Sequence, residues 1–298
     1  MSSPLRSRLS SASATSPTSP TVARPTRSRA VPAREVRYVG RGTGFGAAGV
    51  GGRVSTDLLL ALFGLVGGIG ITAIGPGGVL PTIALFLLTP LGPAQVAGTA
   101  IVTHVATGVA GSAAYVHSGQ LRKAHTRRVA LLLAGAAAVG TPAGVVLNSL
   151  VSARWFGVVL GVFAVVVAAL VVWRKPVARD EPPAATILAL GFGVAVAAGL
   201  VGVGGPMLAV PLLVVVGAEL LEALAAAQVQ SVVIAGAGSL GYLVHGTIDW
   251  HLAAVVGVPE LAGVVLGWKL ARALPTKRLR IVLVVALLAV APYLVLRG

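Results

Sequence analysis

The chain has 298 residues, of which 56% are hydrophobic and only 10% are charged. Soluble domains carry about 25% charged residues, so this composition excludes an ordinary water-soluble protein. The lack of cysteine excludes disulfides, thiolate metal sites and cysteine nucleophiles. The formal net charge of +15 is divided between a basic N-terminal segment and short loops, which is typical of membrane topology rather than of nucleic-acid binding.

Residues 1–56 form the basic segment, rich in Ser, Pro, Thr, Arg and Gly, with nine arginines and one acidic residue, Glu35. Such a segment buries too little apolar surface to offset the entropy of ordering, so we predict a disordered tail. It lacks the apolar stretch of a secretory signal peptide. Contact with anionic lipid head groups and a solvated extension without a role both remain open.

The rest of the chain contains eight apolar runs, each near the ~20 residues that a helix needs to cross ~30 Å of hydrocarbon. These runs do not alternate apolar and polar residues as barrel strands do, so the fold class is an all-α polytopic membrane protein of about eight transmembrane helices. The runs are Leu58–Ile74, Ala94–Val116, Val129–Leu147, Trp155–Trp173, Ala184–Val203, Ala223–Val244, Leu252–Leu270 and Leu279–Leu296.

An internal repeat appears when the sequence is shifted by 127 positions. One offset aligns Gly75–Gly78 with Gly202–Gly205, and it also aligns Tyr115 with Tyr242. The polar stretch 175–183 separates the halves. We therefore predict a tail over 1–56, a first transmembrane repeat over 57–174, a linker over 175–183 and a second repeat over 184–298.

A glycine cluster interrupts the first apolar run of each half, and a short apolar piece follows it. These pieces, Val79–Leu91 and Met207–Val216, are too short to cross and suit half-helices or re-entrant segments. Backbone freed by Gly and Pro is tolerated at membrane depth only where protein or a water-filled cavity surrounds it.

Two orientations follow from the basic loops. If the short pieces do not cross, eight spans result, both termini lie in the cytoplasm, and the basic residues of 272–280 lie outside against the positive-inside rule. If they cross, each half has five spans, the halves are inverted, and all basic loops lie inside with the tail outside. The eight-span arrangement is the preferred prediction.

Glycine- and proline-interrupted segments at equivalent positions of two repeats indicate a transporter's binding site. Half-helix N-termini favour an anion, because their N–H groups are unpaired and the helix dipole is positive there. The alternative is that the glycines only allow close helix packing. The predicted binding residues of these segments are Gly75, Gly77, Gly78, Pro81, Gly202, Gly204, Gly205 and Pro211.

Polar side chains within the spans are the next candidates. Thr103 and His104 align with Gln230 and Ser231 at the same offset, so both halves place polar groups at one depth. We predict that these four residues line the path, with interhelical hydrogen bonding as the alternative.

Glu260 lies near the middle of a predicted span, where an ionisable residue is costly and therefore a functional candidate. We predict that it carries a coupling proton, with His104 as a relay partner. Pairing of Glu260 with Lys269 or an arginine is the alternative. No cofactor is predicted, and the remaining histidines lack metal-ligand spacing.

The chain resembles the sulfite exporter TauE/SafE family of membrane permeases. The resemblance rests on the stretches IGPGGVLP (74–81) and GVGGPMLAVP (202–211), on the runs that end in Tyr115 and Tyr242, and on the two-half plan, and it covers about residues 57–298. It implies transport of a small inorganic or organic anion, such as sulfite or an organosulfonate. The Gly-Pro-Gly-Gly of the first cluster departs from the unbroken glycine run of many members.

Three functional classes remain. A secondary permease of the cytoplasmic membrane, working by alternating access without a nucleotide-binding motif, is favoured. An intramembrane serine hydrolase is the second, since Gly238–Gly241 is weakly similar to the serine motif of rhomboid proteases, although Ser239 has a repeat-mate in Ser112. A membrane scaffold is the third, and it leaves His104 and Glu260 without a purpose. The predicted partners are the anion and the lipid bilayer, with no nucleic acid, and the oligomeric state stays open.

Overall fold

The computed structural model describes residues 50–73, 75–173 and 182–273, together with 281, 284, 285, 288, 289, 291–294 and 296. The described part is predominantly helical and contains no strand, which confirms the predicted all-α class. The elements are α1 (Val50–Ala73), η1 (Pro76–Gly78), α2 (Val79–Leu88), α3 (Pro93–His117), η2 (Gln120–Arg122), α4 (Ala124–Ser149), α5 (Ala153–Trp173), α6 (Ala184–Val201), α7 (Pro206–Val215), α8 (Leu220–Val244) and α9 (Trp250–Ala273).

Seven described helices, α1, α3, α4, α5, α6, α8 and α9, are long and apolar enough to cross a membrane. Of the eighth predicted span, 279–296, the structure describes residues 281, 284, 285, 288, 289, 291–294 and 296, all of them helical, and the remaining positions lie outside the described residues. The helix α1 begins at Val50, within the predicted tail, because helical structure continues beyond the apolar run; residues 1–49 lie outside the described residues.

The predicted short pieces form the separate helices α2 and α7, each ten residues long. At 1.5 Å per residue each extends about 15 Å, half of what crossing the hydrocarbon needs. Their first residues, Val79 and Pro206, are 127 positions apart, as are the first residues of α3 and α8. The internal repeat remains a prediction. The first residues of these two helix pairs lie at the positions expected from an offset of 127.

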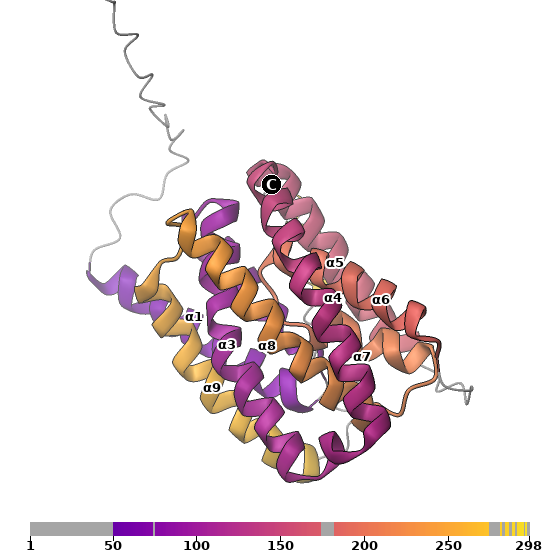
Figure 1. The fold of residues 1–298 in the computed structure, drawn as a ribbon. Helices are drawn as coiled ribbons and strands as arrows, with labels where there is room; N and C mark the ends of the chain where they lie inside the picture. The colour runs from indigo at the N-terminus through magenta and orange to yellow at the C-terminus, as the bar shows by residue number, and fades with distance from the viewer. Residues whose placement is uncertain are drawn as a thin grey trace, which may run out of the picture. The chain divides into compact units, whose positions relative to one another are not determined.

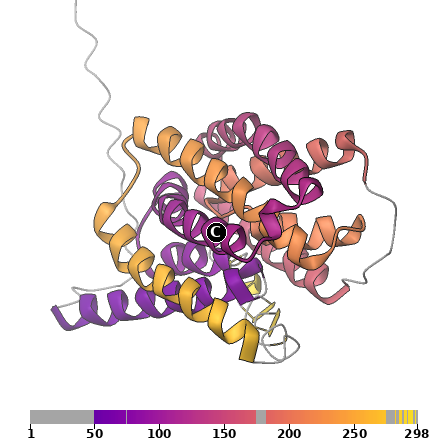
Figure 2. The same ribbon diagram turned by 60° about the horizontal axis from the view of Figure 1, so that its bottom comes forward.

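Small residues bring α1 and α9 into close contact, and the two helices lie side by side in both ribbon views (Figures 1 and 2). A Cβ on Gly64 would collide with the backbone of Val256, and one on Gly68 with the backbone of Glu260. Contacts that advance together along both chains mean that α1 and α9 run parallel. Close approach at small residues is how membrane helices gain packing energy without a hydrophobic driving force between them.

The helices α4 and α6, which also come one from each predicted half, make the corresponding contact. A Cβ on Gly144 would collide with the carbonyl of Val196, and one on Gly191 would meet Leu133. This pair also runs parallel. The central pair α3 and α8 is antiparallel, since Gly98 lies against Tyr242 and Gly111 lies against Gln228.

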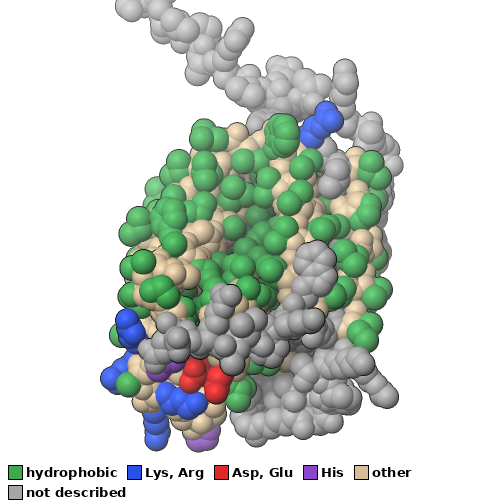
Figure 3. Space-filling view, turned by 90° about the vertical axis from the view of Figure 1, so that its right-hand side faces the viewer, with side chains coloured by type: hydrophobic (Ala, Val, Ile, Leu, Met, Phe, Trp, Pro, Cys, Tyr) green, Lys and Arg blue, Asp and Glu red, His purple; other side chains and the backbone are tan. Residues whose placement is uncertain are grey.

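These directions define two ends of the bundle. At the His251 end α1, α3 and α9 begin, and Asp57 of α1 lies 3.7 Å from His251 of α9. At the Lys123 end α4, α6 and α8 begin, and the Lys123 Nζ atom lies 3.3 Å from the Glu222 Oε1 atom. Figure 3 shows a broad hydrophobic surface, with most of the charged and histidine side chains in view at one end.

Helices at equivalent positions of the two predicted halves therefore run in opposite directions, contrary to the preferred orientation. The helix α3 leads toward the Lys123 end, whereas α8, at the equivalent position, leads away from it. The described end of α9, Ala273, lies at the same end as Lys123, so the basic loops need not be split between two sides. The preferred orientation was wrong because span counting treated α1 and α2 as one crossing, whereas Gly67 lies against Pro81 and α2 turns back along α1.

Candidate functional site

Two turned-back helix pairs, α1–α2 and α6–α7, enter the bundle from opposite ends and meet in its middle. Gly75 has φ 105° and packs against Pro206 and Val210 of α7, and the Thr82 hydroxyl of α2 donates a 3.0 Å hydrogen bond to the Gly202 carbonyl. Gly202 has φ 79° and ends α6. Glycine is needed at both breaks because these backbone conformations are strained for other residues.

A small closed cavity lies where the breaks meet. Its volume of about 10 Å³ suffices for about one water molecule. The N-terminal ends of both short helices border it, through Gly78 before α2 and through Pro206 and Met207 in the first turn of α7. The lining residues are Ile71, Gly75, Gly78, His104, Thr107, Gly204, Pro206, Met207 and Ser231.

His104 supplies the principal polar group of this cavity. Its side chain is 1% exposed, and its Nε2 atom has no hydrogen-bond partner in the described part of the chain. The ring approaches the glycine breaks, because a Cβ on Gly78 would lie 3.3 Å from Cε1 and 3.6 Å from Nε2. The Nε2 atom can therefore contact a ligand in the cavity.

Glu260 lies behind His104, away from the cavity, and is fully buried. The Glu260 Oε1 atom lies 2.9 Å from the His104 Nδ1 atom, an ion-pair distance, although the angles are not those of a well-aligned hydrogen bond. The Thr103 hydroxyl lies 2.5 Å from the Glu260 Oε2 atom. Among the described residues, the partners of Glu260 are Thr103 and His104 of α3. The alternative partner Lys269 has a side chain that lies outside the described residues.

Ser231 completes the polar lining from α8. Its hydroxyl oxygen accepts a 3.3 Å hydrogen bond from the Gly205 backbone N–H, which leaves its hydrogen available to donate into the cavity. A Cβ on Gly204 would lie 2.9 Å from this oxygen. Two helix N-termini, an imidazole and hydroxyls thus face one space, and none of the described carboxylates lines it. This set favours an anion.

Five predicted binding residues line the cavity: Gly75, Gly78, His104, Gly204 and Ser231. The others lie around it. Gly77 and Pro81 pack against α1, Gly202 packs against Ala97, Pro211 is buried within α7, and Gly205 holds Ser231.

Gln230 and Thr103 also lie outside the lining. The Gln230 amide donates a 3.0 Å hydrogen bond to the Gly191 carbonyl. This bond joins α8 to α6 and is the interhelical hydrogen bonding that was the alternative to lining the path. Thr103 contacts Glu260. Four further residues line the cavity without having been predicted from the sequence: Ile71, Thr107, Pro206 and Met207. The spacing of Thr107 from His104, one helical turn, was the signal available for Thr107.

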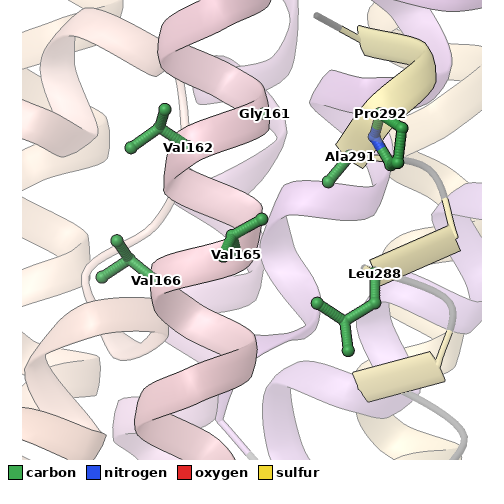
Figure 4. A pocket seen from close by; sticks show the side chains of 7 residues that line it. All are labelled: Gly161, Val162, Val165, Val166, Leu288, Ala291 and Pro292. Atoms are coloured by element: carbon green, nitrogen blue, oxygen red, sulfur yellow. The ribbon is translucent and has the colours of Figure 1, made fainter.

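Larger hollows occur away from the closed cavity and its polar side chains. One of about 430 Å³ lies between α5 and the described residues near the C-terminus (Figure 4). Its lining is apolar throughout, so it offers no group to bind an anion. It is formed by Gly161, Val162, Val165, Val166, Leu288, Ala291 and Pro292.

Two further hollows lie toward opposite ends of the bundle. One of about 330 Å³ adjoins Tyr115 and His117 of α3, and one of about 280 Å³ adjoins Tyr242 and His245. The two tyrosines are the repeat-related pair. One hollow therefore lies toward the Lys123 end of the bundle, and the other lies toward the His251 end.

Metal and nucleophile chemistry find little support among the described residues. They contain no group of three His, Asp or Glu side chains that could hold a metal ion. The Ser239 hydroxyl is buried and has no hydrogen-bond partner there, so no base activates it as a serine hydrolase requires.

Comparisons with known proteins place the chain in a family. The model of the family described as "Sulfite exporter TauE/SafE" matches residues 60–294. A protein of Bacillus subtilis (strain 168), described as "Probable membrane transporter protein YdhB", is 24% identical over 227 residues, which are 73% of this chain and 90% of that protein. No solved structure matches the chain. With the family model spanning nearly all of the helical region, the chain belongs to the sulfite exporter TauE/SafE family of multi-pass membrane transporters.

Proposed function

We propose that this transporter is a secondary permease that moves a small anion, such as sulfite or an organosulfonate, across the cytoplasmic membrane by alternating access. The observation that carries the proposal is the closed cavity between two oppositely directed helix breaks. The His104 Nε2 atom faces it and has no hydrogen-bond partner among the residues that the structure describes. Oppositely oriented half-helices around a midplane site are typical of secondary transporters.

The size of the cavity supports a moving mechanism. A space for about one water molecule is too small for an oxyanion, so the breaks must separate to admit one. In the proposed cycle the two turned-back pairs rock apart toward one end and then toward the other. The hollows beside Tyr115 and Tyr242 are the places where the path would open.

Each lining group has a role in the proposal. The N-termini of α2 and α7 and the Ser231 hydroxyl stabilise the negative charge, and the His104 Nε2 atom donates to it when the ring is protonated. Glu260 holds the Nδ1 side of the ring and accepts or returns the coupling proton. Because an anion adds negative charge beside this pair, binding of the anion and of a proton favour each other.

The positive-inside rule places the Lys123 end in the cytoplasm, because Arg122, Lys123, Arg127 and Arg128 gather there. The His251 end then faces outward.

The test is flux of radiolabelled sulfite into proteoliposomes with and without a pH gradient. We expect gradient-dependent flux for the wild type, and flux without gradient dependence for Glu260→Gln. Ser231→Ala should raise the KM by about tenfold, the effect of one hydrogen bond to a charged group. Gly135→Ala is the control, because nothing lies within 4 Å of the added methyl.

A wild type that moves no sulfite, sulfonate or carboxylate in either direction would contradict the proposal and favour the scaffold alternative. Gradient dependence that survives in Glu260→Gln would remove Glu260 from the coupling while leaving the permease in place.

A further inference from the structure

Gln228 of α8 is a buried polar residue that the site described above does not use. Its side chain is 1% exposed, and neither its Nε2 nor its Oε1 atom has a hydrogen-bond partner in the described part of the chain. An unpaired buried amide is costly, and such groups in native proteins require an explanation.

The position of Gln228 relates it to the central cavity. It precedes Ser231 by three residues, so it lies one turn of α8 closer to the Lys123 end. Its amide packs against Gly111, which lies one turn of α3 beyond Thr107 toward the same end. Because Ser231 and Thr107 line the cavity, Gln228 and Gly111 form the next layer on this side.

Beyond this layer lies the hollow beside Tyr115 and His117, which Gly111 also lines. A Cβ on Gly111 would come within 2.6 Å of the Gln228 Oε1 atom. The missing side chain at position 111 therefore makes room for the amide beside the stretch of α3 that runs from Thr107 at the cavity to Gly111 at the hollow.

The repeat-related position carries no such group. Ile101, 127 positions earlier, packs against Gly238 as Gln228 packs against Gly111. The same contact is apolar on the path to the His251 end and polar on the path to the Lys123 end. Packing alone is thus satisfied by an aliphatic side chain, and the amide needs another reason.

We propose that Gln228 is a substrate-contacting residue outside the central cavity, whose amide N–H groups bind the anion as it passes between the cavity and the hollow beside His117. This inference rests on the proposed function. An uncharged amide suits transit, because it offers two donors without the strong attraction of a fixed cation.

The first test compares Gln228→Leu, which keeps the apolar bulk but removes the donors, with Ile101→Leu at the repeat-related position. We expect the maximal sulfite flux of Gln228→Leu to fall by about tenfold, the effect of one lost hydrogen bond to a charged group. Equilibrium binding of the anion to the purified protein should stay within about twofold, and Gln228→Asn should recover part of the flux. A purely structural role would instead lower binding and flux together.

The second test does not depend on transport. The chain has no cysteine, so Gln228→Cys and Ile101→Cys each introduce a single thiol. In vesicles we expect a negatively charged, membrane-impermeant thiol reagent to modify the Gln228→Cys variant from the Lys123 side and to leave Ile101→Cys unmodified. Equal modification of both variants, or of neither, would overturn the inference even if the wild type carries the anion. Absence of transport with selective modification would instead count against the proposed function alone.

Discussion

At the residue scale, the arrangement of Thr103, His104 and Glu260 is the chemical centre of the molecule. Three side chains from α3 and α9 meet at the depth of the glycine breaks, and all are buried. The Thr103 hydroxyl lies within reach of both the Glu260 carboxylate and the Ala100 carbonyl, but it has one hydrogen. Donation to the carboxylate is the stronger interaction, because that acceptor is charged when ionised.

Thr103→Val should therefore destabilise the folded transporter by about 1–3 kcal/mol, since it leaves a buried carboxylate oxygen without its donor. Unfolding in detergent micelles would measure the change. Thr103→Ser keeps the hydroxyl and is the control. Equal stability of the Val and Ser variants would show that the hydroxyl does not support Glu260.

At the element scale, glycines set how closely the helices approach. Gly68 allows α1 to lie against the backbone of Glu260, so the packing of α1 positions the residue behind His104. The backbone break at Gly202 ends α6 and brings its carbonyl to Thr82. Helix packing and site geometry thus depend on the same small residues.

Gly68→Ala should lower stability by about 1–3 kcal/mol, because the added methyl collides with backbone that cannot rotate away. Gly135→Ala, also in a helix but with nothing within 4 Å, should be neutral or slightly stabilising, given the higher helix propensity of alanine. Thermal unfolding of both variants in one detergent would compare them. Similar midpoints for the two variants would argue against close α1–α9 contact.

Gly202→Ala and Gly119→Ala separate backbone strain from collision. Both glycines have positive φ, 79° and 82°, but only Gly202 lies against a backbone, that of Ala97. Gly119→Ala should cost about 1–2 kcal/mol from the left-handed conformation alone. Gly202→Ala should cost more and also reduce transport, because it displaces the break beside the cavity. Unfolding and flux of the two variants would be measured together, and a Gly119→Ala effect as large as that of Gly202→Ala would contradict the expected order.

At the scale of the whole molecule, the inverted halves decide what each end presents. Each outer helix packs against the other half, α1 with α9 and α6 with α4. Neither half could bury its small-residue faces alone, so the halves are expected to fold as one unit. The described helices indeed belong to a single compact unit, Ala47–Gly298.

The inverted arrangement predicts opposite labelling at the two ends. Lys123→Cys and His251→Cys place single thiols at side chains that are 50% and 73% exposed. In right-side-out vesicles an impermeant thiol reagent should modify the His251→Cys variant and spare Lys123→Cys until the membrane is opened. Modification of both from the same side would contradict the helix directions.

Much of the fold follows from the sequence, because long apolar runs have few solutions in lipid. The all-α class, the spans and the short helices α2 and α7 were predicted from run length and from Gly and Pro, which act locally. The offset of 127 placed the two breaks at equivalent positions, and the mid-span location of Glu260 indicated a polar cluster.

Only the tertiary structure decided direction and proximity. Span counting preferred the wrong orientation, because whether α2 crosses or turns back depends on its contacts with α1 rather than on its own composition. Sequence distance could not separate Gly78, which borders the cavity, from Gly77, which packs on α1, since adjacent residues face different ways. The pairing of His104 with Glu260, 156 positions apart, and the exclusion of Gln230 from the cavity were likewise set by helix packing.

The sequence alone determined which segments are apolar and where they break, because these are properties of local composition. The structure decided which side chains share a space, because that depends on how distant helices meet.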